Sequence, residues 1–253
     1  MIKKIEASKI AEITLLFWLM KICATTLGET AGDLLSMTLN VGYAISTLIL
    51  LSAFVLILIG QLFSKRYIPI LYWSVILATS TAGTTMSDYM DRTLGLGYAT
   101  GSLILVTILI LILCIWYFTE KSLSVTNIKT LKGELFYWAA ILFSNTLGTA
   151  LGDFLADDSG LGFSGGAIFI SSILSIIVLL HYFSKISPVV LFWIAFVLTR
   201  PFGATFGDLL TKTQQQGGFG FGTTGTSFIL FVILIGFIVY ETIKKNKSFN
   251  TVE

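Results

Sequence analysis

The stretch FWLMKICATTLGETAGD, residues 17–33, contains the pattern that decides the fold of this chain. It begins with an aromatic pair and ends in an aspartate that has a glycine one and five positions before it. Three more copies follow: YWSVILATSTAGTTMSD at 72–88, YWAAILFSNTLGTALGD at 137–153 and FWIAFVLTRPFGATFGD at 192–208. The chain therefore consists of one unit repeated four times.

Composition indicates an integral membrane protein of the all-α class. Hydrophobic residues make up 55% of the chain and charged residues 12%, and the mean hydropathy is +0.88. A soluble domain has about 25% charged residues. Apolar runs long enough to cross a bilayer recur along the whole chain. The eight transmembrane helices that we expect lie at residues 10–34, 42–63, 67–90, 98–118, 134–154, 163–183, 187–210 and 222–243.

These helices group into four tandem two-helix repeats within one transmembrane domain, residues 1–253. The repeats run at about 10–63, 67–118, 132–184 and 187–243. Because each repeat crosses the membrane twice, all four units are parallel and are related by an axis along the membrane normal. The aromatic pair that opens each first helix favours the membrane–water interface.

Basic residues place both termini in the cytoplasm, because Lys and Arg accumulate on the cytoplasmic side of a membrane protein. The basic residues on the side of the termini are Lys3, Lys4, Lys9, Lys65, Arg66, Lys121, Lys129, Lys132, Lys185, Lys244, Lys245 and Lys247. The other side has only Arg92 and Lys212, together with most of the aspartates. This acidic outer face is expected to attract cations.

The four repeated aspartates are the strongest indication of a functional site. They are Asp33, Asp88, Asp153 and Asp208. A carboxylate in a membrane segment is costly and usually faces a partner or water. Four units around one axis would bring the aspartates together, whereas a linear array would keep them apart.

A polar stripe continues from each aspartate toward the middle of the membrane, since positions four, seven and eight before it share its helix face. The predicted site residues on this stripe are Glu29, Thr84 and Thr149 at the first level, Thr26, Thr81 and Thr146 at the second, and Asn145 and Arg200 at the third. We expect the stripes to line a path or binding cavity. In the alternative interpretation, each hydroxyl only bonds a backbone carbonyl of its own helix.

Two positions distinguish individual repeats. Glu29 stands one turn from Asp33, so that the two carboxylates can share a proton or hold a cation together. Arg200 lies near mid-membrane and needs a counter-charge, for which Glu29 is nearest in depth. The candidate metal ligands are Glu29, Asp33, Asp88, Asp153 and Asp208. Oxygen-only ligands suit Mg²⁺, Ca²⁺ or Mn²⁺. The small residues before each aspartate are expected to let helices approach closely.

Three segments, TLGETAGD at 26–33, RPFGATFGD at 200–208 and GGFGFGTTGT at 217–226, resemble a family of bacterial proteins of about this length that are described only as uncharacterised membrane-anchored proteins. The resemblance covers nearly the whole chain and implies no particular activity. A weaker similarity connects Glu29 and Asp33 with cation/proton exchangers built on a Glu-x-Gly-Asp motif, which handle calcium or manganese. Here three residues separate the two acids instead of two, and Leu34 and Leu35 follow.

The sequence favours a small-cation transporter or channel, proton-coupled and handling a divalent metal, in a bacterial inner membrane. The expected partners are membrane lipid and a small inorganic cation or proton, with no nucleic acid and no cofactor. Two alternatives remain open: a structural or regulatory subunit whose aspartates cap loops and helix ends, and a transporter of a small organic anion that uses Arg200. An enzyme is not expected, because the chain has one His and no nucleophile elbow or phosphate-binding loop. Oligomeric state is open.

Overall fold

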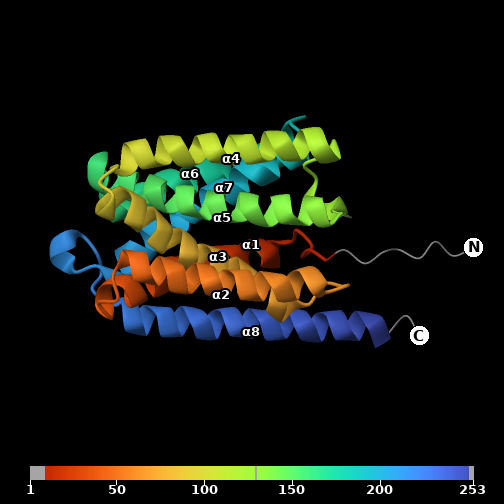
Figure 1. The fold of residues 1–253 in the computed structure, drawn as a ribbon, viewed down its shortest axis with the longest axis horizontal. Helices are drawn as coiled ribbons and strands as arrows, with labels where there is room; N and C mark the ends of the chain where they lie inside the picture. The colour runs from red at the N-terminus through yellow and green to blue at the C-terminus, as the bar shows by residue number, and fades with distance from the viewer. Residues whose placement is uncertain (1–8, 129, 251–253) are drawn as a thin grey trace, which may run out of the picture.

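The computed structural model describes residues 9–128 and 130–250 as an all-helical bundle (Figure 1). Its helices are α1 (Leu15–Asp33), α2 (Tyr43–Phe63), α3 (Pro69–Asp88), α4 (Tyr98–Glu120), α5 (Leu131–Asp153), α6 (Gly162–Phe183), α7 (Pro188–Thr211) and α8 (Thr223–Asn250). The predicted all-α class is confirmed, since these eight helices are present and the described residues contain no strand. Lys3, Lys4 and Lys129 lie outside the described residues.

Short turns connect the long helices. A π-helical turn follows the aspartate in the first three repeats, as η1 (Leu34–Thr38), η2 (Tyr89–Thr93) and η4 (Phe154–Asp158). The 3₁₀ turns are η3 (Val125–Asn127) and η5 (Gln214–Gln216). Gly42 and Gly97 precede α2 and α4 with φ angles of 81° and 73°, a conformation that glycine adopts at little cost. The turns therefore reverse the chain sharply at the same place in successive repeats.

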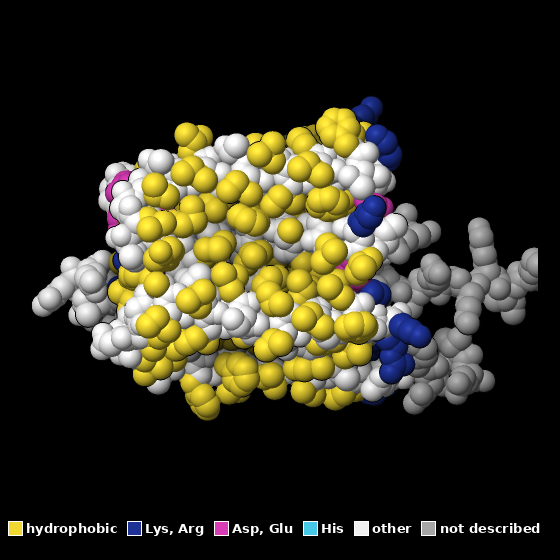
Figure 2. Space-filling view, viewed as in Figure 1, with side chains coloured by type: hydrophobic (Ala, Val, Ile, Leu, Met, Phe, Trp, Pro, Cys, Tyr) yellow, Lys and Arg dark blue, Asp and Glu magenta, His cyan; other side chains and the backbone are white. Residues whose placement is uncertain are grey.

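Six helices are long and apolar enough to cross a membrane, which supports the assignment as a membrane protein. They are α2, α4, α5 with its π turn, α6, α7 and α8. In the other two, α1 and α3, polar side chains interrupt the apolar run, and most of their residues are buried. Figure 2 shows a broad belt of hydrophobic side chains over the middle of the bundle, with Lys and Arg gathered at the end where α8 finishes.

The odd-numbered helices form a closed inner ring. α1 packs on α3, α3 on α5, α5 on α7, and α7 returns to α1. Each even-numbered helix packs outside the first helix of the following repeat: α2 on α3, α4 on α5, α6 on α7 and α8 on α1. The repeats are therefore arranged around one axis and not as a linear array. Figure 1 shows that α1 begins and α8 ends at the same end of the bundle.

Small residues hold the inner ring together, as the sequence predicts. A methyl group on Gly28 would overlap the side chain of Ser80 on the next helix, and one on Gly148 would overlap Arg200. At Gly83 the added carbon would lie 3.0 Å from the backbone nitrogen of Thr146. Gly203 meets Thr25 in the same way and completes the circle. The glycine five positions before each aspartate thus fixes the distance between neighbouring helices.

Candidate functional site

The four aspartates converge at one end of the inner ring. Asp33, Asp88 and Asp153 are the last residues of their α-helices, and Asp208 lies one turn before the end of α7. All four are buried. Asp33, Asp88 and Asp153 make no capping hydrogen bond to the turns that follow them. Their side chains instead make ion pairs with Arg92 or Lys212, which argues against the capping role in the structural-subunit alternative.

Two basic residues divide the four aspartates into two pairs. Arg92 lies 2.9 Å from Asp88 through Nε and 3.2 Å from Asp153 through Nη2. Lys212 lies 2.6 Å from the Asp33 Oδ2 atom and 3.2 Å from the Asp208 Oδ1 atom. Each cation therefore bridges neighbouring repeats, and the fourfold repeat becomes a twofold arrangement.

Neither bridging residue was among the predicted site residues, although their spacing offered a signal. Arg92 and Lys212 each stand four positions after an aspartate, and residues at this spacing face each other on a helix. The matching positions in the other two repeats are Met37 and Asp157. Lys212 lies just beyond α7. Burial lowers the pKa of its ammonium, but the Asp208 and Asp33 carboxylates raise it more strongly, so that the net pKa is above the ordinary value.

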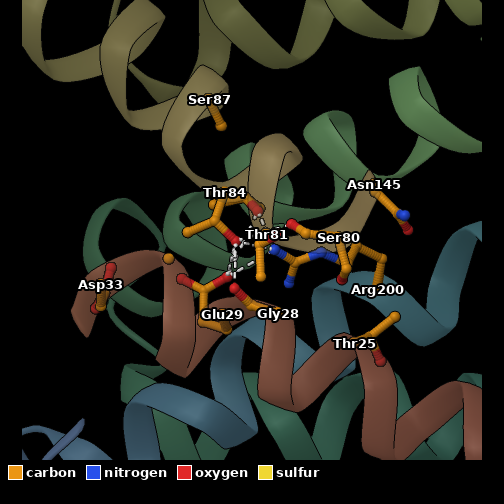
Figure 3. A network of polar contacts seen from close by, with 12 residues as sticks. Thr25, Gly28, Glu29, Asp33, Ser80, Thr81, Thr84, Ser87, Asn145 and Arg200 are labelled. Carbon is orange, nitrogen blue, oxygen red and sulfur yellow. Dashed lines mark hydrogen bonds and ion pairs between the residues drawn. The ribbon is translucent and has the colours of Figure 1, made fainter. Parts of the chain in front are cut away.

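A second polar layer lies one helical turn below the aspartates (Figure 3). The Arg200 Nη2 atom donates to the Glu29 carboxylate at 2.8 Å and to the Thr149 hydroxyl at 2.7 Å. It also donates to the Thr84 hydroxyl. The fourth position of this layer is Ala204, which is fully buried and has no polar side chain. The predicted pairing of Arg200 with Glu29 is therefore confirmed, and it draws together residues from all four repeats.

The third layer contains the deepest polar groups. Thr25, Ser80 and Asn145 are fully buried at this level, where the Arg200 side chain starts. One turn further, the Lys21 ammonium donates to Asn145 Oδ1 at 3.2 Å and lies 4.0 Å from the centre of the Phe196 ring. Lys21 thus faces the axis of the bundle and does not extend to the membrane surface.

The threonines seven positions before the aspartates do not join these layers. Thr26 donates to the Ile22 carbonyl, Thr81 to the Leu77 carbonyl and Thr146 to the Leu142 carbonyl, each within its own helix. A hydroxyl satisfied in this way stabilises a buried position without offering a ligand. The polar column therefore consists of the residues four and eight positions before each aspartate.

Aromatic rings close the opposite end of the inner ring. They form an unbroken cycle in which each ring centre lies within 6.5 Å of the next. The cycle runs Phe17, Trp73, Tyr72, Trp138, Tyr137, Trp193, Phe192, Trp18 and back to Phe17. The Tyr72 and Tyr137 hydroxyls meet at 2.6 Å. The sequence predicts these residues at the membrane interface, but Trp73 and Trp138 are fully buried within the bundle, and the Trp73 indole N–H donates to Glu241 of α8. We call this cycle the aromatic seal.

At the aspartate end a cavity of about 500 Å³ opens to the outside, lined by Asp33, Asp208, Arg92, Lys212 and Thr38 among others. Below it, one carboxylate oxygen each of Glu29, Asp33 and Asp208 lie within 4.8 Å of one another. Three carboxylates at this separation are an oxygen-ligand set of the kind that a hard cation binds. The other two candidate ligands, Asp88 and Asp153, are paired with Arg92 and are not part of this cluster.

The four units of this architecture match a single family model, Repeat of Unknown Function (DUF347), at residues 16–67, 71–122, 136–187 and 191–246. The chain belongs to this family. The internal repeat that the sequence predicts, and the relation to a four-repeat family without assigned function, are thereby confirmed. No curated protein and no solved structure matches the chain.

Each DUF347 repeat of this chain supplies the same parts to the bundle: an aromatic pair for the seal, a glycine for helix contact and an aspartate for the opposite end of the inner ring. The repeats differ at the positions four and eight residues before the aspartate. Glu29 comes from the first repeat only, Asn145 from the third only and Arg200 from the fourth only. One asymmetric site thus lies on the axis of a nearly symmetric scaffold.

Proposed function

We propose that the protein is a carrier for a small cation, with protons as the counter-species, and that the cation binds to Glu29, Asp33 and Asp208. In this proposal all eight helices cross the bacterial inner membrane with both termini in the cytoplasm. α1 and α3 cross because the other helices enclose their polar faces. The end with Lys65, Arg66, Lys121 and Lys185 is then the cytoplasmic one, in accordance with the positive-inside rule.

The observation on which the proposal rests is the three-carboxylate cluster at the floor of an open cavity. In the aspartate layer and the layer below it, five buried carboxylates, Asp33, Asp88, Asp153, Asp208 and Glu29, are paired with Arg92, Lys212 and Arg200. Buried carboxylates this close together repel one another unless a cation or a proton lies between them. Cation and proton therefore compete for the same oxygens, which is the basis of exchange.

Lys212 occupies the position that the transported ion would take. Its ammonium contacts Asp33 and Asp208, and its side chain is 17% exposed at the edge of the cavity. It follows the end of α7, so it can swing outward without disturbing a helix. An arriving divalent cation would displace it, since a metal ion brings more charge to the same two carboxylates. In this proposal Arg92, by contrast, stays paired with Asp88 and Asp153 and only stabilises the contact between their helices.

Two groups of side chains block the axis of the inner ring, and this favours a carrier over an open channel. The Arg200 guanidinium fills the layer below the cation site, and the aromatic seal closes the cytoplasmic end. A cation on Glu29 would compete with Arg200 for the same carboxylate. Binding is thereby coupled to the position of Arg200, and a change in a buried ion pair is a means of switching a helical bundle between two packings.

The alternative of an organic-anion carrier receives less support. The outer cavity is lined by three carboxylates, and its two basic residues, Arg92 and Lys212, are already paired with buried aspartates. Arg200 lies beneath Glu29 with no exposed surface. The oxygens that line the cavity match hard cations such as Mn²⁺, Ca²⁺ or Mg²⁺.

The test is ion flux in proteoliposomes that carry an imposed pH gradient. Mn²⁺, Ca²⁺, Mg²⁺, Na⁺ and K⁺ are added in turn, while interior dyes report pH and divalent ions. We expect flux of at least one ion with opposing proton movement, and its loss in folded Asp33→Asn and Asp208→Asn variants. Asp158→Asn is the matched control, since this exposed aspartate lies at the same end outside the cluster. Equal flux in all three variants, or none in the wild type with any ion, would refute the proposal.

A further inference from the structure

A short segment before α1, residues 9–14, links helices that are not neighbours in the inner ring. We call it the strap. The Lys9 ammonium donates to Glu134 Oε2, in the first turn of α5, at 2.9 Å and to the Leu62 carbonyl, at the end of α2, at 3.0 Å. The Gln61 side-chain amide donates to the Lys9 carbonyl at 3.3 Å. Because α1 and α5 each pack on α3 and on α7, they lie at opposite corners of the ring. The strap therefore connects one corner with the opposite one, at the end of the bundle where α8 finishes (Figure 1).

The strap starts and ends just outside the aromatic seal. Glu134 stands one helical turn before Tyr137 of the seal, and α1 begins at Leu15, just before Phe17. Six residues of extended chain reach about 20 Å. Opposite helix axes lie about 13 Å apart in a ring whose neighbouring axes are about 8 to 10 Å apart. The strap is therefore long enough to lie across the sealed end of the ring.

The contacts of the strap make its attachment specific but also reversible. Ile10 and Ala11 belong to the buried core, with 5% and 4% of their surface exposed. The Glu134 side chain is 5% exposed, whereas the Lys9 side chain is 30% exposed, so water reaches one partner of the ion pair. The Glu134 Oε1 and Gln61 Oε1 atoms are buried and accept no hydrogen bond from any described residue. Detachment of the strap would give water access to these two acceptors, which offsets part of the loss of the ion pair.

We propose that the strap is a gate at the sealed end of the ring: Lys9 fastens it to Glu134 in the closed state, and it detaches when this end opens. The inference rests on the proposed carrier function and names the device that controls its second end. A carrier opens its two ends in turn, and opening one end of a helical ring separates the helices there. A link between α1 and α5 resists this separation and has to break. Lys212 makes a corresponding link at the aspartate end, where its ammonium holds Asp33 of another repeat.

The first experiment measures the exposure of the strap by cysteine labelling. Ala11→Cys is introduced into the full-length protein together with Cys23→Ala and Cys114→Ala, and its rate of reaction with a water-soluble maleimide is measured in detergent. We expect Glu134→Met to raise this rate about ten-fold, as the loss of one hydrogen bond to a charged group would. Glu120→Met is the matched control, since the Glu120 carboxylate lies at the same end and bonds Thr130 instead of Lys9. Equal rates in the two variants would overturn the proposal, whether or not the protein transports an ion.

A second variant keeps this test decisive if Glu134→Met does not fold. Lys9→Met breaks the same link from its more exposed side, and Lys65→Met removes an exposed charge from the same end as its control. We expect faster labelling in Lys9→Met only, and equal labelling in both would again contradict the assigned link.

The last experiment connects the strap with transport. The Ala11→Cys protein is reconstituted in proteoliposomes with maleimide on both sides, and labelling is followed with and without the ion gradient that drives flux. We expect labelling to become faster during flux, and Asp33→Asn to abolish both the flux and this acceleration. Flux without any change in labelling would overturn the gate and leave the carrier proposal intact, whereas failure of the carrier is read from the flux itself.

Discussion

The two ends of the inner ring are built from the same four helices, yet they follow opposite rules. At the end where α1 begins, the four repeats contribute nearly identical aromatic pairs, which pack against one another as the aromatic seal. At the aspartate end the repeats contribute identical aspartates, but Arg92 and Lys212, which are present in two repeats only, divide the aspartates into two pairs. The comparison teaches that symmetry can be kept where residues only fill space. It has to be broken where charges must be balanced, because four like carboxylates cannot neutralise one another.

The largest effect on stability is expected from removing the counter-charge of Arg200, in the polar layer one helical turn below the aspartates. Glu29→Gln leaves Arg200 buried without its counter-charge, and loss of one partner of a buried ion pair costs about 3 to 5 kcal/mol. The unfolding free energy in detergent, from denaturant titration, measures this. Glu12→Gln is the control, since Glu12 is exposed near the start of α1. A loss below about 1 kcal/mol would show that Arg200 finds another partner and that Glu29 is not needed for charge balance.

The second largest effect is expected where a glycine brings two neighbouring inner helices into close contact. Gly83→Ala places a carbon 3.0 Å from the Thr146 backbone nitrogen, and overpacking of this kind costs about 1 to 3 kcal/mol. Gly236→Ala on α8 meets open space and should be neutral or slightly stabilising, because alanine favours helix by up to about 1 kcal/mol. Thermal unfolding of both variants tests the pair. Similar values for the two would mean that the inner helices can separate without cost.

A smaller effect is expected at the aromatic seal. Tyr72→Phe removes the hydroxyl that meets Tyr137 and leaves the ring in place, which should cost about 1 kcal/mol. The variant should also keep flux unchanged, since the rings still close the axis. Tyr182→Phe, at an exposed position on α6, is the control. If Tyr72→Phe instead made the liposomes leak ions, the hydroxyl pair and not the packing of rings would be the closure.

The smallest effect is expected at the Lys212 bridge, which lies at the cavity edge. Lys212→Met should cost about 1 kcal/mol or less, the range of partly solvated ion pairs. Because the pKa of Lys212 is raised in the folded protein, its contribution is fully present below the ordinary lysine pKa and is lost only as the pH rises above it. The stability difference between wild type and variant should therefore stay constant from about pH 7 to 9. Lys185→Met, at the opposite end, controls for the loss of a charge. A difference that disappears by about pH 9 would contradict the raised pKa.

Much of the architecture could be predicted from the chain because the repeat constrains it. The positions of the helices follow from apolar runs, and the glycine contacts follow from the spacing of small residues before each aspartate. The pairing of Arg200 with Glu29 was also predictable, since a buried charge at mid-membrane needs the nearest opposite charge at its own depth. The depth of a residue along a helix follows from its position in the sequence, so the sequence alone shows which charges lie at the same level.

Other features could not be predicted because they depend on which helix faces which. The threonines seven positions before the aspartates lie on nearly the same helix face as the residues eight before, and only the structure shows that these threonines bond to backbone carbonyls of their own helices. The aromatic pairs have the composition of an interfacial belt, and their burial in a seal follows from closure of the ring. The bridges made by Arg92 and Lys212 each join two repeats and become visible only when neighbours are known.

By itself, then, the sequence determined the membrane class, the four-repeat organisation, the helix positions and the set of charged residues at each depth. These properties depend on hydrophobicity and on spacing along a single helix. Only the tertiary structure decided that the repeats close into a ring, that Asp33 and Asp208 share Lys212 above Glu29, and that aromatic rings seal the other end. The reason is physical: the energy of a buried charge or ring depends on distances between separate helices, and these are set by packing and not by the order of residues in any one of them.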